Sequence, residues 1–349
     1  MKLFDTHLRF SSIHQFSGLF FAALGLLVSS LSACSPATYG KGESITEPQL
    51  VQSEFVTADN LVLPTKVWRS DNSVPKAIIV ALHGFNDYAN AFEGPGQYLA
   101  EKYNIAVYAF DQRGFGQAGK RGTWAGTDTY IEDLRDFCQS IRQKYPRLPV
   151  YVLGESMGGA ITMAAFTSEN RPDADGAILV APAVWARSTM PWYQRTALFV
   201  GAHLFPWASF TGEGVVKITP SDNRDMLIAL GQDPLVIKDT KVSAMYGLTN
   251  LMDEALASSA AFNVPSLVMI GDLDEVVPNH PSALMVEQLP EAIDNRKIVV
   301  YKNGYHMLLR DLQAQIVWDD IAAWIENPQQ ELPSHANQTD LDQWLKENL

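Results

Sequence analysis

Residues 154–158, Gly154-Glu155-Ser156-Met157-Gly158, directly follow a short apolar run at 150–153 and precede a segment of small residues at 159–166. This order predicts a strand, a sharp turn and a helix. In that setting the pattern G-x-S-x-G is typical of a nucleophile elbow, where flanking glycines let the backbone turn tightly and expose the serine hydroxyl. Ser156 is therefore the predicted nucleophile. An ordinary surface turn is the alternative, so the interpretation depends on partners for Ser156 elsewhere in the chain.

The overall composition excludes several classes of protein. The chain has 349 residues, of which 47% are hydrophobic, so it can bury a large core. Its formal net charge of -13 argues against nucleic acid as a partner, because binding to phosphates depends on Lys and Arg. The two cysteines, Cys34 and Cys138, are too few for a disulfide framework or a cysteine-rich metal site. We expect no metal and no cofactor.

The first 33 residues have the layout of a secretory signal peptide. Basic residues come first, an apolar run follows at 18–28, and small residues lead to Cys34. The apolar run is shorter than the roughly 20 residues that a membrane-spanning helix needs. Its end, Leu31-Ser32-Ala33-Cys34, resembles the bacterial lipobox, in which the signal is removed before a cysteine that becomes lipid-modified. A free cysteine at this place by coincidence is the alternative.

The lipobox resemblance implies that Cys34 anchors the mature chain in a membrane. Anchoring through several acyl chains is stable where a single chain is marginal. Ser35 resembles the outer-membrane sorting signal of Gram-negative lipoproteins, which implies a location in the bacterial cell envelope, on the outer membrane facing the periplasm. Residues 34–50 are polar and resemble a tether, which fully extended would reach roughly 50 Å. A tether of that length would allow the folded domain to lie clear of the bilayer.

The folded domain is expected over residues 51–327. Two strand-like runs at 51–57 and 61–69 predict an antiparallel hairpin. Continuous apolar runs that alternate with helical segments then predict a mostly parallel sheet flanked by helices. The predicted buried strands are 77–82, 105–110, 150–153, 177–180, 267–270 and 298–301, and helical segments include 89–103, 130–145 and 282–288.

One interval is too long for a crossover between strands. Residues 182–265 contain helix-like pieces of their own and many large apolar residues, such as Trp192 and Trp207. We interpret this interval as an inserted helical cap, whose apolar residues either pack the cap onto the core or line a substrate channel. Residues 328–349 are expected to form a polar tail, with a short terminal helix at 340–347.

A serine nucleophile needs a base, and the base needs a third group to hold it. In proteins with a nucleophile elbow the chain order is serine, acid, histidine. His306 fits this order, because it stands in a glycine-bearing loop directly after the last predicted strand. For the acid, the loop Gly271 to Pro278 offers three carboxylates, those of Asp272, Asp274 and Glu275. We favour Asp274, which lies further from the strand, and keep Asp272 as the alternative.

The oxyanion of an acyl transfer reaction needs hydrogen-bond donors. The backbone N–H of Met157, the residue after the nucleophile, is one predicted donor. The second is the backbone N–H of Phe85, in the turn His83-Gly84-Phe85 that follows the strand 77–82. Each such donor is typically worth about 3 to 4 kcal/mol of barrier.

Taken together, these motifs resemble the α/β-hydrolases of the monoacylglycerol lipase and lysophospholipase group, which is classified with serine aminopeptidases. The resemblance covers roughly Val74 to Trp324. It implies an α/β-hydrolase fold, a triad of Ser156, Asp274 and His306, and a cap that admits an acyl chain. The motifs that carry it are His83-Gly84-Phe85, Asp111 to Gly116, Gly154 to Gly159, Asp233-Pro234-Leu235, Gly271 to Val277 and Gly304-Tyr305-His306.

Two positions depart from the group's usual pattern. Position 155 is Glu where many bacterial and animal members carry His, although a glutamate there resembles plant-type members, and this departure bears on substrate preference rather than on the chemistry. Ala118 stands where a serine often occurs. The expected function is hydrolysis of lipid-like carboxylic esters, such as monoacylglycerols or lysophospholipids, through an acyl-enzyme. An aminopeptidase of the same fold is one alternative, and a non-catalytic lipid-binding protein of the envelope is another. The sequence leaves the oligomeric state open.

Overall fold

The structure is a computed structural model. It describes residues 36–71, 73–211, 218–291, 293–336 and 338–349. The predicted signal peptide at 1–33 and Cys34 therefore lie outside the described residues. Within the described ranges, no helix is long and apolar enough to cross a membrane.

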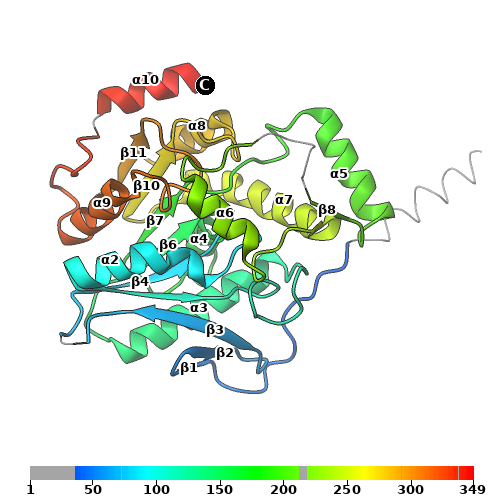
Figure 1. The fold of residues 1–349 in the computed structure, drawn as a ribbon, viewed down its shortest axis with the longest axis horizontal. Coiled ribbons are helices and arrows are strands. Elements are labelled where there is room, and N and C mark those ends of the chain that lie inside the picture. Colours follow the sequence, from blue (N-terminus) through cyan, green and yellow to red (C-terminus); the bar gives the residue numbers. More distant parts are fainter. Residues whose placement is uncertain (1–35, 72, 212–217, 292, 337) are drawn as a thin grey trace, which may run out of the picture.

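The chain is organised around one nine-stranded sheet, in the order β1-β2-β3-β5-β4-β6-β7-β10-β11 (Figure 1). The strands β1 to β3 pair antiparallel, and β3 pairs antiparallel with β5. From β5 to β11 all pairs are parallel. The strands are β1 (Gln49–Val51), β2 (Glu54–Val56), β3 (Val62–Trp68), β4 (Ala77–Leu82), β5 (Ile105–Phe110), β6 (Val150–Glu155), β7 (Gly176–Val180), β10 (Ser266–Gly271) and β11 (Lys297–Tyr301).

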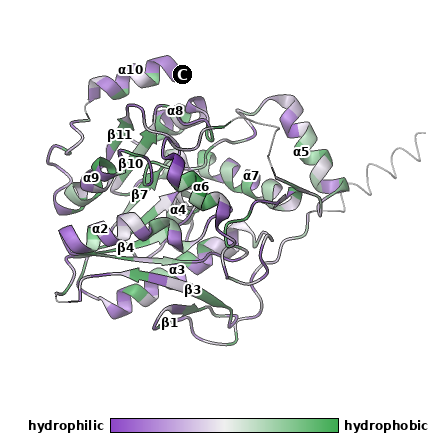
Figure 2. Cartoon of the chain, viewed as in Figure 1, coloured by the Kyte–Doolittle hydropathy of each residue, from purple (hydrophilic) through white to green (hydrophobic). Residues whose placement is uncertain are grey.

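The central strands are buried on both faces, as their continuous apolar runs predict. Every residue of β4, β5 and β10 is buried, and Figure 2 shows hydrophobic strands at the centre of the molecule. One face is covered by α3, α4, α7 and α8, and the other by α2 and α9. The helices of these layers are α2 (Glu93–Tyr103), α3 (Thr127–Lys144), α4 (Met157–Thr167), α7 (Val242–Ala257), α8 (Asn279–Gln288) and α9 (Ala314–Glu326), with 3-10 turns η1 (Ala89–Phe92) and η2 (Ser259–Ala261).

The insertion between β7 and β10 is only partly a cap. Its last helix, α7, buries Leu251 and Ala255 and packs against α3 and α4, so it belongs to the layer that covers the sheet. The part outside that layer consists of α5 (Trp192–Leu204), a two-stranded ribbon of β8 (Ser209–Phe210) and β9 (Thr240–Lys241), and α6 (Arg224–Gln232). The cap is therefore smaller than the predicted range 182–265.

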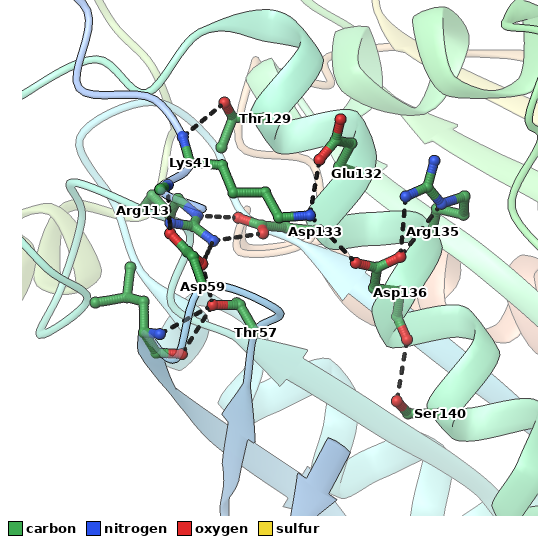
Figure 3. Close-up of polar contacts among 12 residues, drawn as sticks. Lys41, Thr57, Asp59, Arg113, Thr129, Glu132, Asp133, Arg135, Asp136 and Ser140 are labelled. Atoms are coloured by element: carbon green, nitrogen blue, oxygen red, sulfur yellow. Dashed lines mark hydrogen bonds and ion pairs between the residues drawn. The ribbon is translucent and has the colours of Figure 1, made fainter. Parts of the chain in front are cut away.

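The predicted tether is fastened to the domain. The N–H of Tyr39 donates to the Trp124 carbonyl at 2.8 Å. Lys41 pairs with Glu132 on α3 at 2.9 Å, and the Gly42 N–H donates to Asp59 at 2.9 Å (Figure 3). A free tether is therefore wrong from Tyr39 onward, because contacts with residues distant in sequence hold this segment down.

The buried guanidinium of Arg113 holds Asp59, which binds Gly42 of the N-terminal segment, in place. Arg113 forms ion pairs with Asp59 and with Asp133 on α3, both at 2.6 Å, and all three side chains are almost fully buried (Figure 3). Two carboxylates around one forked guanidinium satisfy its donors in a fixed geometry. Arg113 thereby joins three elements beside the N-terminal segment, namely the hairpin of β2 and β3, the loop after β5, and helix α3.

The carboxyl-terminal segment is also more ordered than a polar tail. Helix α10 (Gln338–Asn348) confirms the predicted terminal helix and extends it at both ends. Its residues Leu341 and Trp344 are buried against the core cluster that includes α8. Their spacing of three residues places them on one face of the helix, which explains why the helix packs against the domain despite its polar composition.

Candidate active site

Ser156 lies at a sharp turn between β6 and α4, as the elbow motif predicts. Its backbone has φ 53° and ψ -114°, a left-handed region that a residue other than glycine rarely adopts. The glycines make this turn possible, because a Cβ on Gly154 would lie 2.3 Å from the Gly158 carbonyl oxygen and a Cβ on Gly158 would lie 2.1 Å from that of Leu82. The strained turn thus sets Ser156 at the carboxyl end of β6.

His306 and Asp274 are in contact. The Nδ1 of His306 lies 2.7 Å from Oδ2 of Asp274, and both side chains are buried. The other carboxylate oxygen, Oδ1, accepts the backbone N–H groups of Val276 and Val277 at 2.8 and 2.9 Å. Both Asp274 oxygens are therefore engaged, and the carboxylate is fixed facing the imidazole.

The alternative acid, Asp272, faces elsewhere. It accepts a hydrogen bond from the Asn303 backbone, and burial raises the pKa of its carboxyl. Its own carbonyl accepts the side-chain amide of Asn279 at 2.9 Å. Asp272 therefore acts within the turn that follows β10, and the contact with His306 belongs to Asp274.

Ser156 and His306 follow the carboxyl ends of β6 and β11, two strands of the one parallel part of the sheet, so they share one edge of it. In the described part of the chain no hydrogen bond links the two side chains. Such contacts are often loose until a substrate is bound. The structure thus brings Asp274 and His306 together and places Ser156 at the same edge of the sheet. A hydrogen bond between Ser156 and His306 is not formed among the described residues.

The backbone donors predicted for the oxyanion lie beside the elbow. Met157 is the first residue of α4, so its N–H is among those that a helix leaves without an internal partner. A Cβ on Gly84 would lie 3.4 Å from the Cβ of Ser156, so the loop that carries Phe85 runs directly against the nucleophile. This arrangement matches an oxyanion site between the two loops.

His83 holds that loop in place and is fully buried. Its Nδ1 lies 2.8 Å from the Gly84 carbonyl, and its Nε2 accepts the Gln112 N–H at 3.0 Å. The Gln112 side chain in turn donates to the His83 carbonyl at 2.9 Å. Burial lowers the pKa of His83, so the neutral ring joins the loops after β4 and β5.

The environment of His306 favours its charged form. Burial by itself lowers the pKa of the imidazole, but the charge and hydrogen bond of Asp274, together with the charge of Glu155, raise it above the ordinary value, against a smaller opposing effect of Arg310. A base with a raised pKa takes the proton of a serine more readily.

The sequence alone did not indicate a charged cluster beside the elbow. Arg310 lies between two carboxylates, at 2.7 Å from Asp87 and 3.3 Å from Glu155. All three side chains are largely buried. In the sequence, position 155 is notable only as a departure from the usual histidine, and nothing there points to Arg310 as its partner.

The cap is bonded to the loops on both sides of the site. The hydroxyl of Tyr88 donates to Asp233 at 2.7 Å, which gives the motif Asp233-Pro234-Leu235 a structural role. On the other side, the Met307 N–H donates to the Pro220 carbonyl at 2.9 Å. The cap therefore connects the loop that carries Phe85 with the loop that carries His306.

No metal site emerges from the described residues, since no group of three or more His, Cys, Asp and Glu side chains among them could hold an ion.

A charged hollow near the site has a volume of about 380 Å³. It is lined by Asp87, Asp233, Arg310 and Asp311 among others, and neither Ser156 nor His306 lines it.

Comparison with known proteins places this site in a family. A family model described as serine aminopeptidase, S33, matches residues 73–313. The monoglyceride lipase of Rattus norvegicus is 26% identical over 78% of this chain and 89% of its own length. The monoacylglycerol lipase of Mycolicibacterium smegmatis is 28% identical over 74% of this chain and 91% of its own.

Solved structures agree on the fold. A soluble variant of the monoglyceride lipase of Saccharomyces cerevisiae, in complex with a substrate analog, has a TM-score of 0.65, is 19% identical and covers 84% of this chain and 99% of its own. The monoacylglycerol lipase of Paleococcus ferrophilus has a TM-score of 0.60 at 21% identity, and covers 76% and 99%. With the mostly parallel sheet covered on both faces, this likeness confirms the predicted α/β-hydrolase fold.

Proposed function

The chain belongs to the serine aminopeptidase S33 family, and on that premise we propose that it is a serine hydrolase that cleaves carboxylic esters of lipid-like substrates. The observation that carries the proposal is the hydrogen bond between Asp274 and His306 at the same sheet edge as the Ser156 elbow. A base held by a buried carboxylate beside a partly exposed serine is the arrangement that acyl transfer requires.

The proposed reaction has two steps. His306 takes the proton of Ser156, whose oxygen attacks the acyl carbonyl, while the N–H groups of Phe85 and Met157 hold the oxyanion. The imidazolium then gives its proton to the leaving alcohol, and an acyl-enzyme remains. Water, deprotonated by His306, releases the carboxylic acid and restores the serine.

Monoacylglycerols or lysophospholipids are the proposed substrates. Relatives over about three quarters of the chain are named monoglyceride and monoacylglycerol lipases, and one that matches 60% of the chain is named phospholipase. The family description keeps an aminopeptidase as the second candidate. A non-catalytic lipid-binding protein is the weakest alternative, because it would not need the contact between Asp274 and His306.

One series of substrates distinguishes ester hydrolysis from peptide hydrolysis. The domain from Pro36 onward is expected to hydrolyse glycerol monoesters from acetyl to palmitoyl with kcat/KM rising toward long chains, because each buried methylene adds about 0.8 kcal/mol of binding. Aminoacyl amides should be poor substrates under the same conditions. Turnover confined to the amides would overturn the ester proposal and assign the chain as an aminopeptidase.

We further propose that the protein is a lipoprotein anchored through Cys34 to a bacterial membrane. The first fastened residue, Tyr39, follows Cys34 closely in the sequence, so the domain lies within about 18 Å of the anchor. Tyr39 is bound to Trp124, whose ring packs against Gly247 of α7, and α7 in turn packs against α5. These contacts favour a position of the anchor on the side of the domain that carries the cap.

The outer surface of the cap suits contact with the bilayer. Helix α5 buries only Ala202, and it carries hydrophobic residues over much of its length (Figure 2). Exposed aromatic side chains with apolar bodies are favoured at a membrane interface. The exposed aromatic residues of this surface are Trp192, Tyr193, Phe199, Phe205, Trp207 and Phe210.

Removal of two of these aromatic residues is expected to weaken membrane binding. The domain from Pro36 onward with Trp207→Glu and Phe210→Glu should partition to phospholipid vesicles at least about tenfold less than the unchanged domain, since each aromatic side chain contributes about 1.5 to 3 kcal/mol when buried. Co-sedimentation with vesicles measures this. Val74→Glu, an equally drastic change at an exposed residue between β3 and β4, is the control. Equal binding by all three proteins would contradict the proposed surface.

A further inference from the structure

Arg310 connects the three loops that form the proposed active site. It belongs to the loop that carries His306, four residues further along. Its guanidinium reaches Asp87, on the loop after β4, at 2.7 Å, and Glu155, the last residue of β6, at 3.3 Å. Asp87 also accepts the N–H of Tyr88 at 2.9 Å. One guanidinium therefore joins the base, the nucleophile elbow and the loop that carries Phe85.

The charges of this cluster do not cancel. Two carboxylates share one guanidinium, so with both ionised one negative charge is uncompensated in a buried place. Burial raises the pKa of Glu155, and the positive charges of Arg310 and His306 oppose that effect and favour the carboxylate. Glu155 Oε1 is buried without a hydrogen-bond partner among the described residues, as is Arg310 Nε. A buried carboxylate that is half satisfied costs free energy unless another positive charge compensates it. The imidazolium that His306 becomes during the reaction is a charge of that kind.

Charged groups from several elements act on the His306 imidazole. Asp274 contacts it at 2.7 Å from the loop after β10, Glu155 acts on it from the end of β6, next to Ser156, and Arg310 acts on it from its own loop. Asp87 acts on Glu155 and Arg310. After Asp274, Glu155 is the carboxylate whose charge raises the pKa of His306 most, and Asp87 is not among the main charges that act on it.

We propose that Glu155 is a positioning residue whose buried negative charge, held by Arg310, stabilises the imidazolium of His306 during catalysis, as a second carboxylate beside Asp274. This inference rests on the proposed hydrolase function and deepens it. It does not extend to members of the resembling group that carry histidine at this position, because a neutral histidine supplies no such charge.

The test compares two variants that each neutralise one carboxylate on Arg310. Glu155→Gln should lower the pKa of His306, because the negative charge of Glu155 favours the protonated imidazole. The acidic limb of kcat/KM, measured with a short-chain ester, then moves to lower pH, and kcat at pH 8 falls severalfold with KM unchanged. Asp87→Asn should move the limb by less than half as much, since Asp87 is not among the main charges that act on the imidazole.

A second measurement does not depend on activity. Titration of the ¹⁵N-labelled histidines by NMR reports the pKa of His306 in the full domain and in Glu155→Gln. If that variant fails to fold, Glu155→His provides a neutral replacement above pH 7. Glu132→Gln, which removes a carboxylate that faces Lys41, controls for the change in net charge and should leave the His306 pKa in place.

The outcomes distinguish the inference from the function. Equal shifts in Glu155→Gln and Asp87→Asn, or none in either, would overturn the inference, because they would assign the cluster a structural role alone. If the wild type is active and the acidic limb of kcat/KM stays in place in Glu155→Gln, the inference is likewise overturned. A wild type that hydrolyses no ester would instead sink the proposed function, while a shifted His306 pKa in the NMR titration would still support the electrostatic role of Glu155.

Discussion

Ser156→Ala is expected to lower kcat for ester hydrolysis by about 10⁴- to 10⁶-fold, because the acyl-enzyme cannot form without its hydroxyl. Alanine has no polar atom to replace it, and the backbone geometry of the elbow is unaffected by the loss of one oxygen. Turnover of a glycerol monoester and labelling by a fluorophosphonate measure the effect. Both should be absent in the variant and present in the wild type.

A matched serine supplies the control. Ser168 lies at the other end of α4, where its hydroxyl donates to the Ala165 carbonyl at 2.8 Å. Ser168→Ala should keep full labelling and turnover. If Ser156→Ala retained more than about a hundredth of the wild-type kcat, the nucleophile would lie elsewhere and the catalytic role of the elbow would be wrong.

The sheet and the elbow could be predicted because local sequence specifies them. Strands buried on both faces read as continuous apolar runs, as β4 and β10 do. The turn at Ser156 requires glycines where β6 approaches α4 and where α4 approaches the end of β4, and these glycines are visible in the sequence. For the same reason His306 and Asp274 could be proposed from chain order and their place after strands.

Contacts between distant residues could not be predicted in this way. The segment after Tyr39 looks like a linker by composition, but Lys41 meets Glu132, which lies 91 residues away. Arg310 and Glu155 are 155 residues apart, and only the folded sheet brings them together. The position of helix α7 within a long insertion suggests that it belongs to the cap, whereas its buried face packs against α4.

The choice between Asp272 and Asp274 as the acid also depends on contacts that only the folded chain makes. Asp272 and Asp274 are two residues apart and both follow β10. Their chemistry is identical in the sequence, and only the turn decides which carboxylate faces the imidazole. The backbone N–H groups of Val276 and Val277 orient Asp274, and this contact is a property of the folded loop.

Asp274→Asn is expected to lower kcat by about 10⁴-fold, through the tautomer of His306. In the structure Oδ1 of Asp274 accepts two backbone N–H groups, so an asparagine must keep its carbonyl oxygen there. Its NH₂ group then takes the place of Oδ2, 2.7 Å from Nδ1 of His306, and donates to that nitrogen. The proton of the neutral ring is forced to Nε2, which can no longer accept the proton of Ser156.

The pH dependence separates this cause from a change in the ionisation of His306. Asp274 raises the pKa of His306, so its replacement lowers that pKa and moves the acidic limb of kcat/KM to lower pH. At pH 9 the base is neutral in both proteins, so a change in its ionisation alone has no effect there, whereas the wrong tautomer persists. We therefore expect the loss to remain at pH 9. Asp272→Asn, whose carboxylate faces Asn303, should stay within a few fold of the wild type, and a larger loss in Asp272→Asn than in Asp274→Asn would reassign the acid.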